Sequence, residues 1–337
     1  MELNPQTKTL TTHLPLPAYI QENVPLADKN WFRTGGPARW YSEPTTPEEF
    51  QQAVMWARQE QLPIFILGEG ANILISDEGY QGLVIRPQLK EISELPSTEL
   101  PATAEPNTAH ICAQAGVKIP DLIKYCLEHN LCGLEEFSGI PGTVGGSVFI
   151  NIHYFEFFLS NFLVSAQVVD NQTGALETVD KSWFNFGYDY SKLHDQRHYL
   201  VSATFVLKQV DPITAAYAKG RSVEIIRHRV SRYPNKNTCG SFFRNFFPEE
   251  VTIESNGKKM IYVAYYLDKL AIKGHLAIGG ALISYQHANM LVTRDGATSA
   301  DVINLARTMQ ELVHKEFGII PQAECQFVGF TKYPLHR

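Results

Sequence analysis

Residues 138–147 read Ser-Gly-Ile-Pro-Gly-Thr-Val-Gly-Gly-Ser, and this stretch constrains the fold more than any other. Four glycines within eight residues, next to a proline, fit neither an ordinary helix nor an ordinary strand. Glycine lets the backbone approach a ligand closely, and successive exposed N–H groups form a concavity suited to an anion such as pyrophosphate. The alternative for such a cluster is a tight surface loop without a ligand.

A second glycine-rich turn, Gly68-Glu69-Gly70-Ala71-Asn72, lies upstream between two short apolar runs. The turn is not a Rossmann fingerprint, because no helix pattern opens directly after it and the third glycine is missing. It is not a Walker loop either, since no Gly-Lys-Ser/Thr follows. A structural turn is the simpler interpretation of this segment alone. Together, the two glycine segments leave open a dinucleotide held in a different fold.

Composition excludes several classes of function. The chain has 337 residues, which suggests two or three domains, and a net charge of −6, which argues against a nucleic-acid partner. The local basic cluster at residues 227–232 is interpreted as a solvated helix face. No apolar segment is long enough to span a bilayer, and the N-terminus lacks a signal-peptide pattern.

The five cysteines are odd in number and lack Cys-x-x-Cys spacing, which favours reduced thiols in a cytoplasm over disulfides or a metal site. We therefore expect a cytoplasmic protein without a bound metal.

Apolar periodicity predicts an α+β chain with a break near residues 208–215. We expect helices over 47–61, 120–130, 213–233 and 299–317, the last with Ser299 as N-cap and Gly318 just past its end. We expect strands over 63–67, 73–75, 82–87, 110–115, 164–170 and 200–207. Residues 88–108, rich in Pro, Thr, Ser and Glu, are expected to form a poorly packed connection.

Two polar residues in the C-terminal half of the chain are candidates for a catalytic role. Ser241 follows a glycine and precedes two aromatic residues, although a turn-capping serine would look the same. Glu324 lies in an otherwise apolar, strand-like segment, where a carboxylate costs free energy unless it is paired or functional. A solvent-facing strand position is the alternative for Glu324.

The ordered motifs resemble those of the UDP-N-acetylenolpyruvoylglucosamine reductase family. The resemblance covers residues 20–330 and rests on Phe32–Ala38, Leu67–Asn72, Ser138–Gly146, Gly240–Asn245, Ile278–Ala281, His287–Asn289, and Glu324 five residues before Gly329. It implies a vanillyl-alcohol-oxidase (PCMH-type) FAD-binding fold of two subdomains plus a C-terminal α+β substrate-binding domain. The implied divisions are a tail over 1–19, FAD-binding subdomains over 20–87 and 88–211, and a substrate-binding domain over 212–337.

The resemblance also implies an activity: NADPH reduces FAD, which passes hydride to an enolpyruvyl ether of a UDP-sugar, giving UDP-N-acetylmuramate for peptidoglycan. We expect a monomer whose partner is this small-molecule UDP-sugar. The residues expected to bind FAD are Gly68, Glu69, Gly70, Ala71, Asn72, Ser138, Gly139, Ile140, Pro141, Gly142, Thr143, Gly145, Gly146 and Ser147. Ser241 matches the serine that protonates the substrate carbon, Glu324 a glutamate that assists at the carboxyl end, and Asn245 a substrate-contacting asparagine.

Two departures from the family pattern affect the reacting end. The family's Tyr-Arg-x-Ser is Tyr188-Asp189-Tyr190-Ser191 here, so an anion replaces the cation that pairs with the substrate carboxylate. Arg244 is a candidate replacement cation at the substrate site, and Lys192 is a less suitable one. The family's Asn-Ala-Gly-Ala-Tyr-Gly-Gly is Asn-Ile-His-Tyr-Phe-Glu-Phe at 151–157, so three glycines become His153, Glu156 and Phe157.

Bulky residues at positive φ in this loop would be strained or would reshape it. Two alternatives to the reductase therefore stand: a flavin oxidoreductase with another substrate, and an FAD-binding homologue that has lost turnover.

Overall fold

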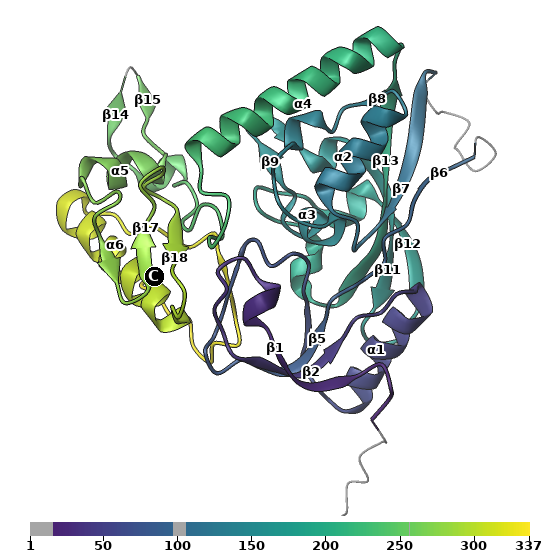
Figure 1. Ribbon diagram of the computed structural model, residues 1–337, viewed down its shortest axis with the longest axis horizontal. Coiled ribbons are helices and arrows are strands. Elements are labelled where there is room, and N and C mark those ends of the chain that lie inside the picture. The colour runs from purple at the N-terminus through teal and green to yellow at the C-terminus, as the bar shows by residue number, and fades with distance from the viewer. Residues whose placement is uncertain (1–15, 97–105, 256) are drawn as a thin grey trace, which may run out of the picture.

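The computed structural model describes residues 16–96, 106–255 and 257–337. Its buried apolar side chains form one core of two clusters about the N-terminal sheet, a second core around the central sheet and a third in the C-terminal region. The long helix α4 (Pro212–Arg232) runs from the central sheet toward the C-terminal region, which lies to one side (Figure 1). Most of the expected tail over 1–19, and the middle of the expected connection over 88–108, lie outside the described residues.

The N-terminal sheet has the strand order β1-β2-β5-β3. Its strands are β1 (Gln21–Pro25), β2 (Pro37–Ser42), β5 (Tyr80–Ile85) and β3 (Ile64–Ile66). Strand β5 pairs in parallel with both β2 and β3, and helix α1 (Pro47–Gln59) covers the sheet with Phe50, Val54 and Ala57 buried. Thr46 caps α1 by accepting the Glu49 N–H.

The first glycine turn, residues 68–72, lies between β3 and β4 (Ile73–Ile75). Strand β4 pairs in parallel with β19 (Gln326–Val328), which comes from the end of the chain. This pairing brings the segment that carries Glu324 next to the first glycine turn.

The central sheet follows the order β12-β11-β13-β7-β6, and β8 pairs with the end of β13. These strands are β6 (Ile92–Glu94), β7 (Thr108–Gln114), β8 (Leu131–Cys132), β11 (Leu163–Asp170), β12 (Leu176–Asp180) and β13 (His198–Gln209). Helices α2 (Ile119–Glu128) and α3 (Val144–Ile150) share its apolar core through Leu122, Ile123 and Val148. The second glycine segment therefore enters α3 directly.

The C-terminal region packs α5 (Val263–Lys269) and α6 (Ser299–Phe317) with the sheet β16-β17-β18. These strands are β16 (Ala277–Ile278), β17 (Ala281–Ile283) and β18 (Leu291–Thr293), and a small hairpin of β14 (Glu254–Ser255) and β15 (Lys258–Lys259) projects from the region.

The structure corrects one helix cap. Thr298, rather than Ser299, is the N-cap of α6, because its side chain accepts the Asp301 N–H. Ser299 is the first helical residue instead, and its N–H donates to Asp77 Oδ1 at 2.8 Å while its hydroxyl accepts the Asp77 N–H at 2.9 Å. This reciprocal pair ties the N-terminal region to α6. Gly318 adopts φ 72° at the end of the helix, as expected.

The other expected elements are present with shifted bounds. The four expected helices begin or end within two residues of the prediction, and every expected strand has a counterpart. The segment 88–108 is more ordered than expected at its start, because β6 pairs with β7 there.

Candidate functional site

A cavity of about 470 Å³ lies between the two glycine segments. Eleven of the residues expected to bind the cofactor line it: Gly68, Glu69, Gly70, Ala71, Asn72, Pro141, Gly142, Thr143, Gly145, Gly146 and Ser147. Gly139 and Ile140 line a second cavity instead. Ser138 lines neither, because its buried hydroxyl bonds to Ser222 on α4 at 2.7 Å. The Ser138 hydroxyl therefore anchors this segment to α4.

The two glycine segments approach each other more closely than side chains would allow. A Cβ on Gly68 would lie 2.6 Å from the Thr143 hydroxyl, and Gly142 adopts φ 148°, which favours glycine. Thr143 caps α3 by accepting the Gly146 N–H at 3.2 Å. The cavity wall is thus mostly backbone, which is the surface that a pyrophosphate needs.

Charged side chains border this cavity. Glu69 lies 3.4 Å from Lys118 and 3.8 Å from Arg86, so two cations stand near the first glycine turn. The Asn72 side-chain oxygen is buried without a hydrogen-bond partner among the described residues. Glycine-walled space, nearby cations and an unpaired amide oxygen fit a dinucleotide cofactor with a pyrophosphate and polar rings.

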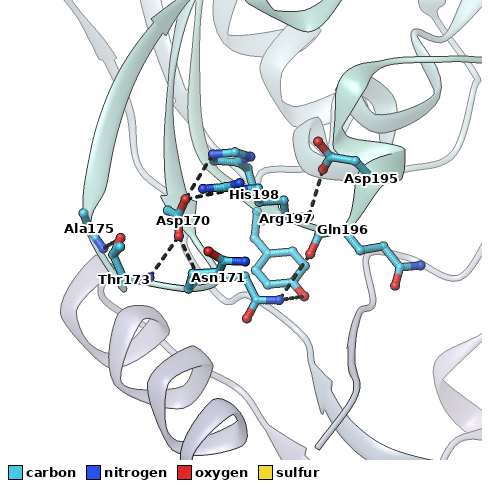
Figure 2. Close-up of polar contacts among 10 residues, drawn as sticks. Asp170, Asn171, Thr173, Ala175, Asp195, Gln196, Arg197 and His198 are labelled. Atoms are coloured by element: carbon cyan, nitrogen blue, oxygen red, sulfur yellow. Dashed lines mark hydrogen bonds and ion pairs between the residues drawn. The ribbon is translucent and has the colours of Figure 1, made fainter. Parts of the chain in front are cut away.

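A polar network that we did not predict supports one wall of the same cavity (Figure 2). The Asp170 carboxylate accepts the Gln172 and Thr173 N–H groups at 2.6 and 2.9 Å and lies 3.5 Å from His198 Nε2. His198 and Tyr199 at the start of β13 line the cavity. No sequence motif marks these residues; the one available signal is an aspartate at the end of one strand and a histidine at the start of another.

A second cavity of about 400 Å³ adjoins the first. The two share a boundary formed by Ala71, Asn72, Pro141, Ile150 and Ile152. The second cavity is lined by Ser241, Asn245 and Glu324, and also by Asp189 and His153. The structure therefore brings the predicted catalytic residues and both departures from the family pattern to one place, beside the cofactor cavity.

Ser241 and Glu324 come from two segments that run side by side. The Glu324 N–H donates to the Phe242 carbonyl at 2.9 Å, and Phe243 forms an antiparallel bridge with Ala323. Asn289 braces this pair, because its amide donates to the Phe243 carbonyl at 2.7 Å and its oxygen accepts the Phe243 N–H. Burial, and then the nearby Asp189 carboxylate, hold the pKa of Glu324 well above its usual range. The surroundings of Glu324 therefore favour its neutral form.

The segment 153–158 is reshaped into a two-stranded hairpin, as expected if bulky residues replace glycines. Strand β9 (His153–Tyr154) pairs with β10 (Phe157–Phe158), and the turn residue Phe155 adopts φ 53°. None of the three substituted positions has a positive φ. His153 stacks on Phe158, and its Nδ1 lies 3.6 Å from Asp189 Oδ1.

Three cations near the second cavity differ in availability. Arg244 forms a bidentate pair with Glu250, with N–O distances of 2.8 and 2.7 Å, and does not line the cavity. Lys192 points elsewhere, with its ammonium 4.5 Å from the Trp183 ring centroid. Arg229 does line the cavity, donating to the Gly139 carbonyl at 3.2 Å between the rings of Tyr154 and Tyr233.

The interpretation of residues 227–232 as a solvated face is therefore wrong for Arg229. A long helix without a marked apolar stripe gave no signal that one arginine turns inward.

Comparisons with known proteins agree with this geometry. A family model described as the FAD binding domain matches residues 38–180, and one described as the C-terminal domain of UDP-N-acetylenolpyruvoylglucosamine reductase matches 233–328. A reductase of that name from Synechococcus sp. (strain WH7803) is 33% identical over 92% of this chain and 94% of its own. The chain belongs to the UDP-N-acetylenolpyruvoylglucosamine reductase family.

Other members of the reductase family give the same result. The protein of that name from Listeria monocytogenes serotype 4b (strain CLIP80459) is 30% identical over 93% of this chain and 96% of its own. The crystal structure of the reductase from Thermus caldophilus superposes with a TM-score of 0.70 at 25% identity, covering 92% of this chain and all of that one. The expected family and FAD-binding fold are confirmed.

Across residues 16–96, 106–255 and 257–337, no helix has both the length and the apolar character required to cross a membrane. Within the same ranges, no group of three or more His, Cys, Asp and Glu side chains is arranged to hold a metal ion.

Proposed function

We propose that this protein is an FAD-dependent reductase that converts UDP-N-acetylenolpyruvoylglucosamine to UDP-N-acetylmuramate with NADPH. The observation that carries the proposal is the convergence of Ser241, Glu324 and Asn245 on a cavity that shares a wall with the glycine-lined cofactor cavity. FAD held by the two glycine segments would supply the hydride chemistry between NADPH and the enolpyruvyl double bond.

The residues of this chain would supply the rest of the reaction. Hydride addition leaves negative charge at the carbon next to the carboxylate, and a positioned proton donor there is worth about 10²–10⁴ in rate. Ser241, whose hydroxyl has no partner among the described residues, is the proposed donor. Glu324, whose pKa burial raises, would lie at the carboxyl end of the substrate.

Arg229 and Asn245 would orient the substrate. The Arg229 guanidinium is held between two tyrosine rings, which places a cation at the cavity wall. The Asn245 amide lies beside the Tyr188 hydroxyl, where a hydrogen bond from it offsets part of the rise that burial causes in the Tyr188 pKa. Arg244 is engaged with Glu250, so we propose that it supports this wall rather than the substrate directly.

A second function is favoured by one observation. The hairpin 153–158 and Asp189 replace glycines and an arginine at the reacting end, which suits a flavin oxidoreductase with another substrate. A homologue that binds FAD without turnover is the other outcome.

Three finer assignments belong to the proposal. We propose that the protein is a monomer and that it is cytoplasmic. The five free cysteines support the cytoplasmic assignment. We also propose the division into 20–87, 88–211 and 212–337, with the cores beneath the two sheets and in the C-terminal region as support. Phe32 and Leu74 pack into the third core, so these parts share an interface.

Anaerobic stopped-flow spectroscopy tests the proposed function. The FAD-loaded protein is reduced with NADPH, mixed with the enolpyruvyl substrate, and followed by flavin absorbance. Reoxidation that depends on the enolpyruvyl substrate supports the reductase. Reduction by NADPH followed by no reoxidation would rule out this substrate and leave the alternatives.

A further inference from the structure

The second cavity contains a carboxyl group, that of Asp189, which forms no ion pair with a lysine or arginine among the described residues. Asp189 lines the cavity at the position where the resemblance places an arginine that pairs with the substrate carboxylate. Arg244, the cation that acts on Asp189, is bound bidentately by Glu250. Two carboxylates facing each other without a counter-ion would repel, so a charged Asp189 would oppose binding of a carboxylate-bearing substrate.

The backbone fixes Asp189 in this position. It adopts φ 52° in a turn closed by the Gly187 N–H donating to the Tyr190 carbonyl at 3.0 Å. The Asn151 amide holds the same turn by donating to the Gly187 carbonyl at 2.9 Å. These bonds fix the backbone at Asp189, and with it the direction in which its Cβ points.

The groups around Asp189 favour its neutral form. Its Oδ2 is buried without a hydrogen-bond partner among the described residues, and Glu324 places a second carboxyl nearby. His153 lies 3.6 Å from Oδ1, on the hairpin, and the Tyr188 phenol is the adjacent residue. Among these groups, Arg244 alone brings a permanent positive charge, and Glu250 shares it.

We infer that Asp189 binds the substrate as an uncharged carboxylic acid, donating a hydrogen bond from its carboxyl O–H to the carboxylate that the family's arginine would otherwise pair with. The inference rests on the proposed function, since it names how that site holds its substrate. An O–H donor to a carboxylate is a charge-assisted hydrogen bond, which is stronger than a neutral one. The arrangement replaces an ion pair by a donor whose presence depends on pH.

The direction of the pH dependence follows from the surroundings. Burial raises the pKa of Asp189 to about 6, and Arg244 opposes that rise. The donor is therefore present below about pH 6 and absent above it. Burial lowers the pKa of His153 below its ordinary value.

Calorimetry on the FAD-loaded protein tests this inference through binding alone. The carboxylate ligand is UDP-N-acetylmuramate, and the matched ligand without a carboxylate is UDP-N-acetylglucosamine. We expect the wild type to bind UDP-N-acetylmuramate about 25-fold more tightly at pH 5.5 than at pH 7.5, the ratio given by the fraction of Asp189 protonated. Binding of UDP-N-acetylglucosamine should change less than about twofold, because it presents no carboxylate to Asp189.

Two variants identify the titrating group. Asp189→Asn keeps a neutral N–H donor of similar shape and cannot ionise, so its affinity for UDP-N-acetylmuramate should stay high at both pH values. His153→Gln removes the imidazole that lies 3.6 Å from Asp189 Oδ1, and it should retain the pH dependence of the wild type. Loss of the pH dependence in His153→Gln, or its persistence in Asp189→Asn, would overturn the inference.

The two ligands also separate this inference from the proposed function. If UDP-N-acetylglucosamine binds but UDP-N-acetylmuramate binds at neither pH, Asp189 rejects carboxylates and the inference is wrong. If neither UDP-sugar binds at any pH, the proposed function fails, and the inference fails with it.

Discussion

The two adjoining cavities are lined by different kinds of groups. The first is walled by glycine-rich backbone, with charged side chains at its border, whereas the second is lined by titratable and aromatic side chains. The family pattern is retained in the glycine segments and broken at Asp189 and residues 153–157. Backbone shape can therefore keep a cofactor site in place while a few side chains alter the chemistry at the reacting end.

The largest predicted effect is at the reacting end. Ser241→Ala should slow substrate-dependent reoxidation by about 10²–10⁴-fold, because it removes the proposed proton donor. Reduction by NADPH and FAD affinity should not change, since Ser241 lines the second cavity and not the first. Stopped-flow measurement of both steps checks this. Ser231→Ala, an exposed serine on α4, is the control, and an unaltered rate in Ser241→Ala would remove the serine from the mechanism.

The next effect concerns the cofactor cavity. Gly146→Leu should weaken FAD binding by about 100-fold, the order of an overpacking cost of up to 3 kcal/mol. A Cβ at Gly146 meets only the Thr143 hydroxyl, at 3.6 Å, so the backbone should tolerate the change. Fluorescence titration with FAD measures the affinity. Gly220→Leu, on α4 with open space around it, should bind FAD normally; equal affinity in both variants would place the cofactor elsewhere.

A smaller effect is expected on the free energy of unfolding, through Asp189 in the second cavity. Asp189 has a folded-state pKa of about 6, above its ordinary value of 3.8, so folding disfavours its ionised form. The stability that the neutral form provides is present below about pH 4 and lost as pH rises through 6.

Asp189→Asn should therefore match the wild type near pH 4 and exceed it by about 2 kcal/mol at pH 8, allowing for partial exposure. Thermal unfolding of the two proteins across this range measures the difference. Glu156→Gln, an exposed carboxylate on the hairpin, should show no such pH-dependent gain. If the gain in unfolding free energy is the same at every pH, the ionised form of Asp189 is not disfavoured by folding.

The smallest effect should leave both cavities unchanged. Asp77→Ala removes the acceptor for the Ser299 and Ala300 N–H groups at the start of α6, and should cost about 1 kcal/mol of unfolding free energy. Denaturant unfolding measures this cost, with the neighbouring Glu78→Ala as control. FAD affinity and its pH dependence should remain as in the wild type. A loss of FAD binding would mean that the α6 junction shapes the cofactor cavity.

Much of this architecture could be predicted from local patterns. The glycine segments and the helices 47–59 and 299–317 carry strong local signals, which the structure bears out. Arg229 could not be predicted, because its inward direction depends on where α4 crosses the second cavity. The same holds for His198, whose partner Asp170 lies on another strand, and for the bond between Asp77 and Ser299. Contacts between distant segments decide these positions, and a single sequence does not record them.

The most direct test of the contrast between the two cavities is the pH dependence of reoxidation by the enolpyruvyl substrate after reduction with NADPH. We predict that reoxidation is about 25-fold faster at pH 5.5 than at pH 7.5 in the wild type and nearly constant in Asp189→Asn. FAD affinity should change less than about twofold over the same range, because Asp189 does not line the cofactor cavity. A wild-type rate that is constant or rises with pH would contradict the account.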